Sequence, residues 1–101
     1  MDYLEIVSVR LASSQDIEAV IRFCREALTS GTTGRFELYR SLGSGTDLSV
    51  HIHRTLGNAE GKERSLLGLQ LARGLGDYGL VSHTLWVDQR KELKGKNSML
   101  A

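Results

Sequence analysis

The amino-acid sequence predicts one α+β domain, with strands and helices in the order β-α-β-β-α-β. Three observations lead to this fold class. Four segments alternate apolar and polar residues or are rich in β-branched residues, as strands are. Two further segments repeat their apolar residues every three or four positions, as helices do. The chain has 101 residues, which is the length of a single domain with one hydrophobic core.

The first third of the chain predicts a strand followed by an amphipathic helix. Residues 4–12 are rich in β-branched side chains and carry apolar residues on both faces, as does a central strand that is covered on both sides. Ser13 and Asp16 then form a capping-box-like start, with an N-cap hydroxyl and a carboxylate three residues later. Apolar residues recur at helical spacing over 17–28, and Gly31 is a suitable stop.

The next two strands form a predicted hairpin. Residues 35–42 and 48–55 have the pattern of antiparallel strands, and the turn at 43–47 contains glycines that permit positive φ. Asn58 provides an N-cap for a second helix that runs to about Leu75 and repeats its leucines every four residues. Glycines inside this helix weaken its propensity, so we expect it to depend on tertiary packing.

A fourth strand over 80–88 completes a ferredoxin-like, split-βαβ topology. Right-handed crossovers place the first and third strands at the centre of a four-stranded antiparallel sheet, with both helices on one face. We expect this domain to span residues 1–93, and residues 94–101 to form a flexible C-terminal tail.

Composition argues against several classes of partner. Thirteen basic and twelve acidic residues leave a net charge of +1, so electrostatics favours neither nucleic acid nor an acidic membrane surface. No apolar run approaches the roughly 18 residues of a membrane span, and the N-terminus has no signal-peptide pattern. The single cysteine, Cys24, excludes an internal disulfide and lies in the apolar stripe of the first helix, where we expect a buried, inert thiol. These features predict a cytoplasmic protein.

His51 and His53 are the most informative residues of the sequence. They lie two positions apart in the third strand, where leucine, valine and isoleucine alternate with them and should face the core. Both imidazoles therefore belong to the sheet face away from the helices. On the fourth strand, either His83 with its alternate neighbours or Trp86 with its own alternate neighbours shares that face.

Aromatic side chains near these histidines predict a small-molecule pocket. An imidazole titrates near neutral pH, so either histidine can act as a catalytic proton acceptor. Aromatic walls with a few polar groups are typical of ligand sites. The residues that we expect around the pocket come from three strands and are Phe36, Tyr39, Arg40, His51, His53 and Trp86. The alternative is that Phe36 and Trp86 pack in the core or at a dimer interface.

The same two histidines also permit a metal site. His-x-His on one strand can present two imidazoles to one ion. His83 would supply a third, but its strand is two strands away from the third strand, roughly 10 Å, and Glu5 is the carboxylate nearest that gap. A metal site on His51 and His53 is therefore kept as an alternative, and no resident metal is expected.

Three other motifs are not expected to form sites. Residues 74–79 match G-x-G-x-x-G, but a helix precedes them and a strand follows, the reverse of a dinucleotide-binding turn. The first and third strands lack the base-stacking aromatics of RNA-binding domains beyond Tyr3. A Ser-His-Asp triad is possible by composition, but no nucleophile elbow is present.

The segments FELYRSL (36–42) and LSVHIH (48–53), joined by the glycine-containing turn, resemble the dimeric α/β-barrel superfamily. The nearest branch is the antibiotic-biosynthesis-monooxygenase-like proteins, and the resemblance covers the layout of residues 3–90. It implies a homodimer whose second sheet faces meet across a two-fold axis. Members hold small aromatic or polyketide-like substrates, haem or signalling molecules in a pocket between sheet and helices, and some oxidise their substrates with no cofactor.

The resemblance thus implies a small-molecule enzyme similar to cofactor-independent monooxygenases, in which His51 or His53 takes a proton from a phenolic substrate. The chain departs from the family pattern in three ways. The oxygenase and haem-degrading branches commonly carry an asparagine near the end of the first strand, where this chain has Ser8, Val9 and Arg10. Members often carry Glu-x-Trp where this chain has His51-x-His53, and the second helix has no histidine to ligate haem. Haem degradation is therefore not expected. The alternative is a non-catalytic small-ligand-binding or stress-response dimer in which the same face is only an interface.

Overall fold

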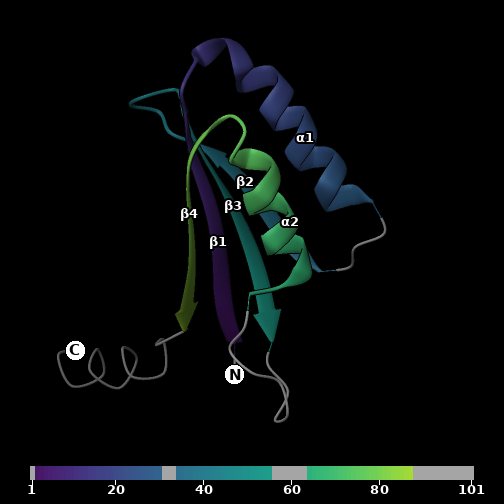
Figure 1. Cartoon of the computed structure of the whole chain (residues 1–101). Coiled ribbons are helices and arrows are strands. Elements are labelled where there is room, and N and C mark those ends of the chain that lie inside the picture. The colour runs from purple at the N-terminus through teal and green to yellow at the C-terminus, as the bar shows by residue number, and fades with distance from the viewer. Residues whose placement is uncertain (1, 31–33, 56–63, 88–101) are drawn as a thin grey trace, which may run out of the picture.

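The computed structural model describes residues 2–30, 34–55 and 64–87 of the chain. Its elements follow the predicted order (Figure 1). They are β1 (Asp2–Leu11), the 3₁₀ turn η1 (Ser14–Asp16), α1 (Ile17–Thr29), β2 (Arg35–Arg40), β3 (Asp47–Thr55), α2 (Leu66–Leu75) and β4 (Gly79–Val87). The α+β class and the β-α-β-β-α-β order are therefore confirmed.

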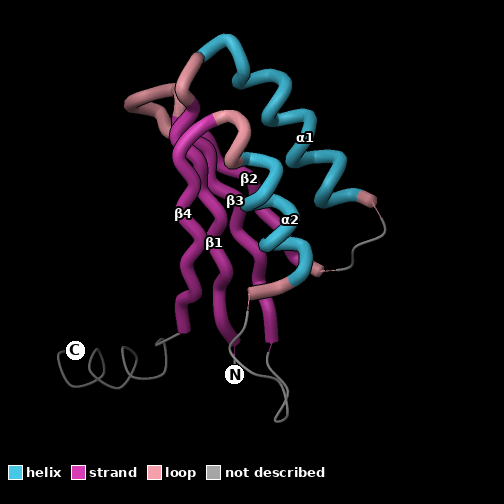
Figure 2. Tube along the Cα trace, viewed as in Figure 1, coloured by secondary structure: helices cyan, strands magenta, loops and turns pink. Residues whose placement is uncertain are grey.

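One four-stranded antiparallel sheet, in the order β2-β3-β1-β4, forms one layer of the molecule. β1 and β3 occupy the centre, as right-handed crossovers require. Figure 2 shows α1 and α2 on the same face of this sheet. This is the ferredoxin-like arrangement that the sequence predicted. We call the sheet face away from the helices the open face, because no element of the described ranges covers it.

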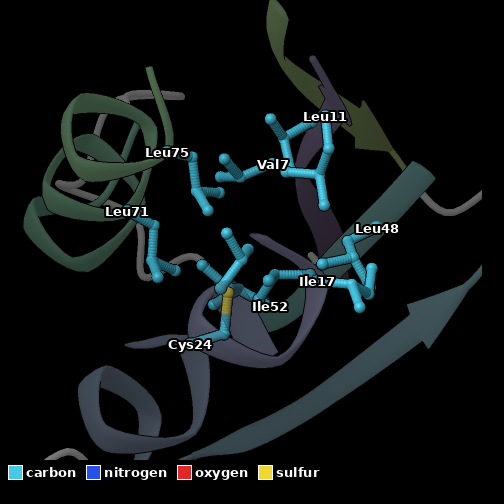
Figure 3. Close-up of a cluster of buried hydrophobic side chains, with 11 residues drawn as sticks. Val7, Leu11, Ile17, Cys24, Leu48, Ile52, Leu71 and Leu75 are labelled. Atoms are coloured by element: carbon cyan, nitrogen blue, oxygen red, sulfur yellow. The ribbon is translucent and has the colours of Figure 1, made fainter. Parts of the chain in front are cut away.

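The hydrophobic core lies between the sheet and the two helices. Figure 3 shows side chains of α1, α2 and the sheet meeting in this layer. The buried residues of the cluster are Val7, Val9, Leu11, Ile17, Val20, Cys24, Leu48, Val50, Ile52, Leu71 and Leu75. Removing one leucine side chain fully from water contributes about 2 kcal/mol. Burial in this layer is therefore what holds both helices against the sheet.

The two faces of β1 are covered unequally. Its odd-numbered residues over 3–11 are buried toward the helices, whereas its even-numbered residues are half-buried or exposed. Leu4 and Ile6 belong to the second set and are half-buried on the open face. The prediction of a central strand covered on both sides is thus confirmed only on the helix side in the described part of the chain.

The second helix begins later than predicted. Ser65 is its N-cap, because the Ser65 hydroxyl accepts a hydrogen bond from the Gly68 N–H (2.9 Å) and Ser65 itself is extended. The prediction of one helix from Asn58 to Leu75 is therefore wrong at its start. Asn58 lies outside the described residues, as does Gly31, the predicted stop of the first helix. Within the described ranges, neither helix is long and apolar enough to cross a membrane.

Two other boundaries need comment. β2 ends at Arg40, two residues before the predicted end, because the Ser41 N–H turns to donate to the Asp47 carbonyl (2.9 Å) and starts the hairpin turn. The predicted domain limit at residue 93 and the predicted tail over 94–101 lie outside the described residues.

The buried thiol of Cys24 gives a test of the core. Burial raises the pKa of Cys24 from 9.0 to about 11, because the thiolate would lose its hydration. The folded chain should therefore hold about 100-fold less thiolate than the unfolded chain near pH 8. We expect an aromatic disulfide reagent to modify the native protein at least that much more slowly than the protein in guanidinium chloride. Equal rates in both states would contradict the burial of this side chain.

Candidate functional site

Four of the predicted site residues lie on the open face. β3 presents His51 and His53 there, β2 presents Tyr39 and β4 presents Trp86, because cross-strand partners share a face. Leu4 of β1 links them, since it pairs with His53 on one side and with Trp86 on the other. Of the two arrangements of β4 that the sequence allowed, the structure therefore has the one with Trp86 on the open face.

Phe36 and Arg40 belong to the opposite face of the sheet. Phe36 pairs with Ile52 and packs against the core beneath the helices. The Arg40 Nε donates to the carbonyl of Gly45 in the hairpin turn (3.1 Å). Both residues alternate with Tyr39 along β2, so their side chains leave the strand on the other side. The structure does not bring them together with the histidines.

His51 is fixed beside an aromatic ring. Its Nε2 lies 2.9 Å from the Ser49 hydroxyl. Its ring centroid lies 4.8 Å from that of Tyr39, with the two planes 56° apart. Tilted contacts of this kind are favourable between aromatic rings. The partners of His51 are therefore a hydroxyl and a ring.

His53 is paired with a carboxylate. Its Nε2 lies 2.7 Å from Glu37 Oε1, and Glu37 Oε2 lies 3.5 Å from Arg35 Nη2. An ionised carboxylate only accepts hydrogen bonds, so Nε2 carries the proton and Nδ1 is the ring nitrogen that can accept another. The hydrogen bond from His53 lowers the pKa of Glu37, and positive charge on His53 and Arg35 lowers it further, against the opposing effect of burial. A carboxylate that orients an imidazole is the arrangement of a general base.

A hollow of about 480 Å³ opens at the end of the sheet beside His53. Small-molecule sites span roughly 300–1,000 Å³, so its size suits a small ligand. Its wall is formed by Asp2, Tyr3, Leu4, Arg35, His53, Arg54, Thr55, Trp86 and Val87. Of the predicted site residues, His53 and Trp86 belong to this wall, whereas His51 and Tyr39 lie farther along the strands.

This hollow is not in the place that the resemblance implied. The expected pocket lay between sheet and helices, a layer where the side chains of the core pack together. The hollow instead takes its wall from residues of both sheet faces, at the end where β3 and β4 finish and β1 begins. Its position was not predictable from the sequence, because the alignment of the strand ends depends on the pairing register.

A buried glutamate connects several elements on the helix side of the hollow. Glu5 is fully buried, and its Oε2 lies 2.5 Å from His83 Nε2. The Ser65 N–H donates to both carboxylate oxygens, at 3.2 and 3.0 Å. Arg54 Nη1 lies 3.4 Å from Glu5 Oε1, and the guanidinium carbon lies 4.8 Å from the centre of the Tyr3 ring. Glu5 therefore ties β1 to β3, to β4 and to the start of α2.

Sequence reasoning placed Glu5 near the gap between His83 and the third strand but did not predict this cluster, although one further signal was present. Glu5 is the single acidic residue among the alternating side chains of β1 that face the helices. A carboxylate buried without partners would be very unfavourable, so its position alone predicts a cationic or donor group nearby. His83 and Arg54 were not identifiable as those partners, because the pairing register of β1 with β3 and β4 brings them together.

The structure also bears on the metal alternative. His83 faces the helices, on the opposite side of the sheet from His51 and His53, so the three imidazoles cannot share one ion. Among the described residues, no group of three or more histidine, cysteine, aspartate or glutamate side chains is placed to hold a metal. A two-histidine site on His51 and His53 stays a prediction.

Comparison with known proteins establishes the fold. No protein-family model matches the chain, and no curated protein matches it. An asparagine-to-alanine variant of SnoaB, a cofactor-independent oxygenase from Streptomyces nogalater, is similar with a TM-score of 0.57 and 14% identity, over 87% of this chain and 93% of that chain. Rv0793 from Mycobacterium tuberculosis is similar with a TM-score of 0.56 and 13% identity, over 87% and 95%. The chain therefore shares the ferredoxin-like fold of these two proteins, as the sequence resemblance implied.

The space that the Glu5 side chain occupies beneath α2 depends on Gly68 having no side chain. A Cβ atom on Gly68 would lie 2.0 Å from Glu5 Oε2 and 2.9 Å from His83 Nε2. We expect Gly68→Ala to lower the free energy of unfolding by about 1–3 kcal/mol, because the buried, hydrogen-bonded side chains of Glu5 and His83 must move. In an open helix position the same change would stabilise by up to about 1 kcal/mol, so the sign is diagnostic. Urea unfolding followed by circular dichroism measures it.

Gly76→Ala is the matched control. Gly76 has φ −60°, and the atom nearest to an added Cβ is the Arg73 carbonyl oxygen at 3.4 Å. That site accepts alanine without strain, so we expect stability to be unchanged or slightly raised. If Gly68→Ala were as well tolerated as Gly76→Ala, the close approach of α2 to Glu5 would be contradicted.

Proposed function

We propose that this chain is a small-molecule enzyme resembling cofactor-independent monooxygenases, with the hollow at the end of the sheet as its substrate site. The observation that carries the proposal is the Glu37–His53 pair, 2.7 Å apart, on β2 and β3 beside that hollow. Trp86 on the same wall offers an aromatic surface to the substrate. The likeness in fold to a cofactor-independent oxygenase supports the same class of chemistry.

The chemistry begins with a proton transfer. A phenolic substrate gives its hydroxyl proton to His53 Nδ1, and the Glu37 carboxylate stabilises the imidazolium that forms. The electron-rich phenolate then reduces dioxygen, which is the only co-reactant. One oxygen atom bonds to a ring carbon, and the other leaves as water with the two displaced hydrogens. The balanced reaction is phenol plus dioxygen to quinone plus water.

Substitution of His53 tests this proposal. We expect His53→Gln to lower the turnover of a phenolic substrate about 100-fold or more, since a positioned general base contributes that much. Glu37→Gln should cause a smaller loss, because the imidazole stays but its orienting charge is removed. An oxygen electrode, with a panel of one- to three-ring phenols, measures dioxygen consumption, and quinone absorbance measures the product. Arg22→Gln, on the exposed surface of α1, is the matched control.

The outcomes separate the candidate functions. A greater loss in His51→Gln than in His53→Gln would move the proton acceptor to His51 and overturn the role of the Glu37 pair. Ligand binding in the hollow with no dioxygen consumption by the wild-type chain would favour a non-catalytic small-ligand-binding or stress-response protein instead. Both of these functions use the hollow beside His53.

We further propose that a second copy of the chain covers the open face. Tyr39, Leu80 and Trp86 on this face are 50%, 78% and 57% exposed, with the half-buried Leu4 and Ile6 between them. Apolar side chains gathered on one face of a sheet favour a protein partner. A two-fold dimer places the same surface of each copy against the other.

A charge at the centre of the open face tests the dimer. We expect the wild-type chain to sediment as a dimer and Ile6→Glu to sediment as a monomer, because an unpaired carboxylate in the interface is costly. Ala19→Glu, on the exposed side of α1, is the control and should stay dimeric. Sedimentation velocity at several concentrations makes the measurement. A monomeric wild-type chain would contradict this use of the face.

A further inference from the structure

We infer that the hollow at the end of the sheet binds an aromatic acid: Arg35 holds its carboxylate, Arg54 adds positive charge from the helix side of the wall, and Trp86 lies against its ring. This inference rests on the proposed function, for which it names the substrate class. The observations that carry it are the charge of the wall, the way Arg54 is held, and the order of side chains across the sheet.

The ionisable side chains of the wall are mostly cationic. Arg35 and Arg54 belong to it, against one carboxylate, Asp2, which already accepts a hydrogen bond from the Thr55 hydroxyl (3.0 Å). His53 becomes a further cation when it takes a proton. Glu37 and Glu5 lie beside the two arginines, so the wall favours an anion through the guanidinium donors that face the hollow and not through net charge. The planar fork of an arginine matches the geometry of a carboxylate, which a single ammonium does not.

Arg54 is held in position from two sides. The Tyr3 ring lies under its guanidinium, and Glu5 Oε1 lies 3.4 Å from its Nη1. Glu5 in turn is fixed by His83 and by the Ser65 N–H. The side chain of Arg54 is still 26% exposed to solvent while it makes these contacts. A cation fixed before binding loses little conformational entropy when an anion arrives.

Arg35 approaches from the neighbouring strand. Its side chain is 73% exposed, and its contact with Glu37 is long, at 3.5 Å. The shorter bond of Glu37, at 2.7 Å, is with His53. Glu37 therefore serves mainly as the partner of His53, and Arg35 can turn toward a carboxylate in the hollow.

The order of side chains across the open face specifies the ligand further. Arg35 pairs with His53, His53 with Leu4, and Leu4 with Trp86, so the four form one row across β2, β3, β1 and β4. Neighbouring strands are roughly 4.8 Å apart. A carboxylate at Arg35 thus leaves His53 beside the next ring position, with the ring over Leu4 and against Trp86. A hydroxyl next to the carboxylate would meet His53.

The indole of Trp86 is positioned for this contact and also reports on it. Its Nε1 donates to the Thr84 hydroxyl (2.9 Å), which fixes the plane of the ring. Trp86 is the single tryptophan of the chain, so an amide correlation spectrum holds one indole N–H signal. A shift of that signal on titration therefore places a ligand at this wall without assignment of the other signals.

The test compares an acid with its neutral counterpart. The probes are 1-hydroxy-2-naphthoate and 1-hydroxy-2-naphthamide, titrated into the full chain by calorimetry and by NMR. We expect the acid to bind at least about tenfold more tightly than the amide, since charge-assisted hydrogen bonds to arginine distinguish them. Binding of the acid should shift the Trp86 indole signal and should weaken with added salt.

Arginine variants assign the effect to the wall. Arg35→Gln should weaken binding of the acid about tenfold and leave binding of the amide unchanged. Arg54→Gln should act in the same direction, and amide binding checks that this variant is folded, because Arg54 also contacts Glu5. Arg22→Gln on α1 is the matched control and should bind both probes as the wild-type chain does.

The possible results separate this inference from the proposed function. Equal affinity for acid and amide, or unchanged acid binding in Arg35→Gln, would overturn the assignment of an aromatic acid. Dioxygen consumption with neutral phenols alone would keep the proposed function and also overturn the assignment. Selective binding of the acid with no dioxygen consumption from any phenol would support the assignment and overturn the proposed function.

Discussion

The burial of one carboxylate constrains the arrangement of this domain. Glu5 sits on the helix side of the central strand with no exposed surface, and a charge in that position is tolerated only if donors surround it. β4 supplies His83, β3 supplies Arg54, and the start of α2 supplies the Ser65 N–H. Because these donors come from different elements, any shift of α2 along the sheet would leave the carboxylate short of partners. Gly68 allows α2 the close approach that this geometry requires.

Strands and helices that follow from local residue patterns were predictable from the sequence. Features that depend on contacts between residues far apart in the chain, such as the start of α2, were less predictable. Alternation and helical spacing identified the four strands and both α-helices of the described ranges, and right-handed crossovers then determined the strand order. The start of α2 was misplaced because Asn58 and Ser65 are both acceptable N-caps. Ser65 has the additional role of donating its N–H to Glu5, a contact between residues 60 positions apart. Local capping preference contains no information about such a contact.

The candidate site was predictable as far as it depends on parity, that is, on the alternation of side chains between the two faces of the sheet. Parity correctly placed His51 and His53 on the face away from the helices. It also separates Phe36 from Tyr39, since residues an odd number apart in a strand point to opposite faces. The sequence prediction grouped them by chemical type and so joined residues that the sheet keeps apart. The hollow beside His53 could not be predicted from the sequence, because it depends on how the ends of four strands align.

The described part of the chain has two glutamate–histidine pairs that differ in burial, and in the proposed function the two pairs have different roles. In the Glu5–His83 pair both side chains are almost withdrawn from solvent, at 0% and 8% exposure, so a substrate has little access and the pair serves the packing of α2. In the Glu37–His53 pair about a third of each side chain stays exposed, at 30% and 34%. At this partial exposure, the second ring nitrogen of His53 could be reached by a small molecule. Arg54 connects the two pairs, since it contacts Glu5 in the interior and lines the hollow beside His53. In the proposed site, the buried pair would thereby contribute indirectly, by fixing the cation that faces the hollow.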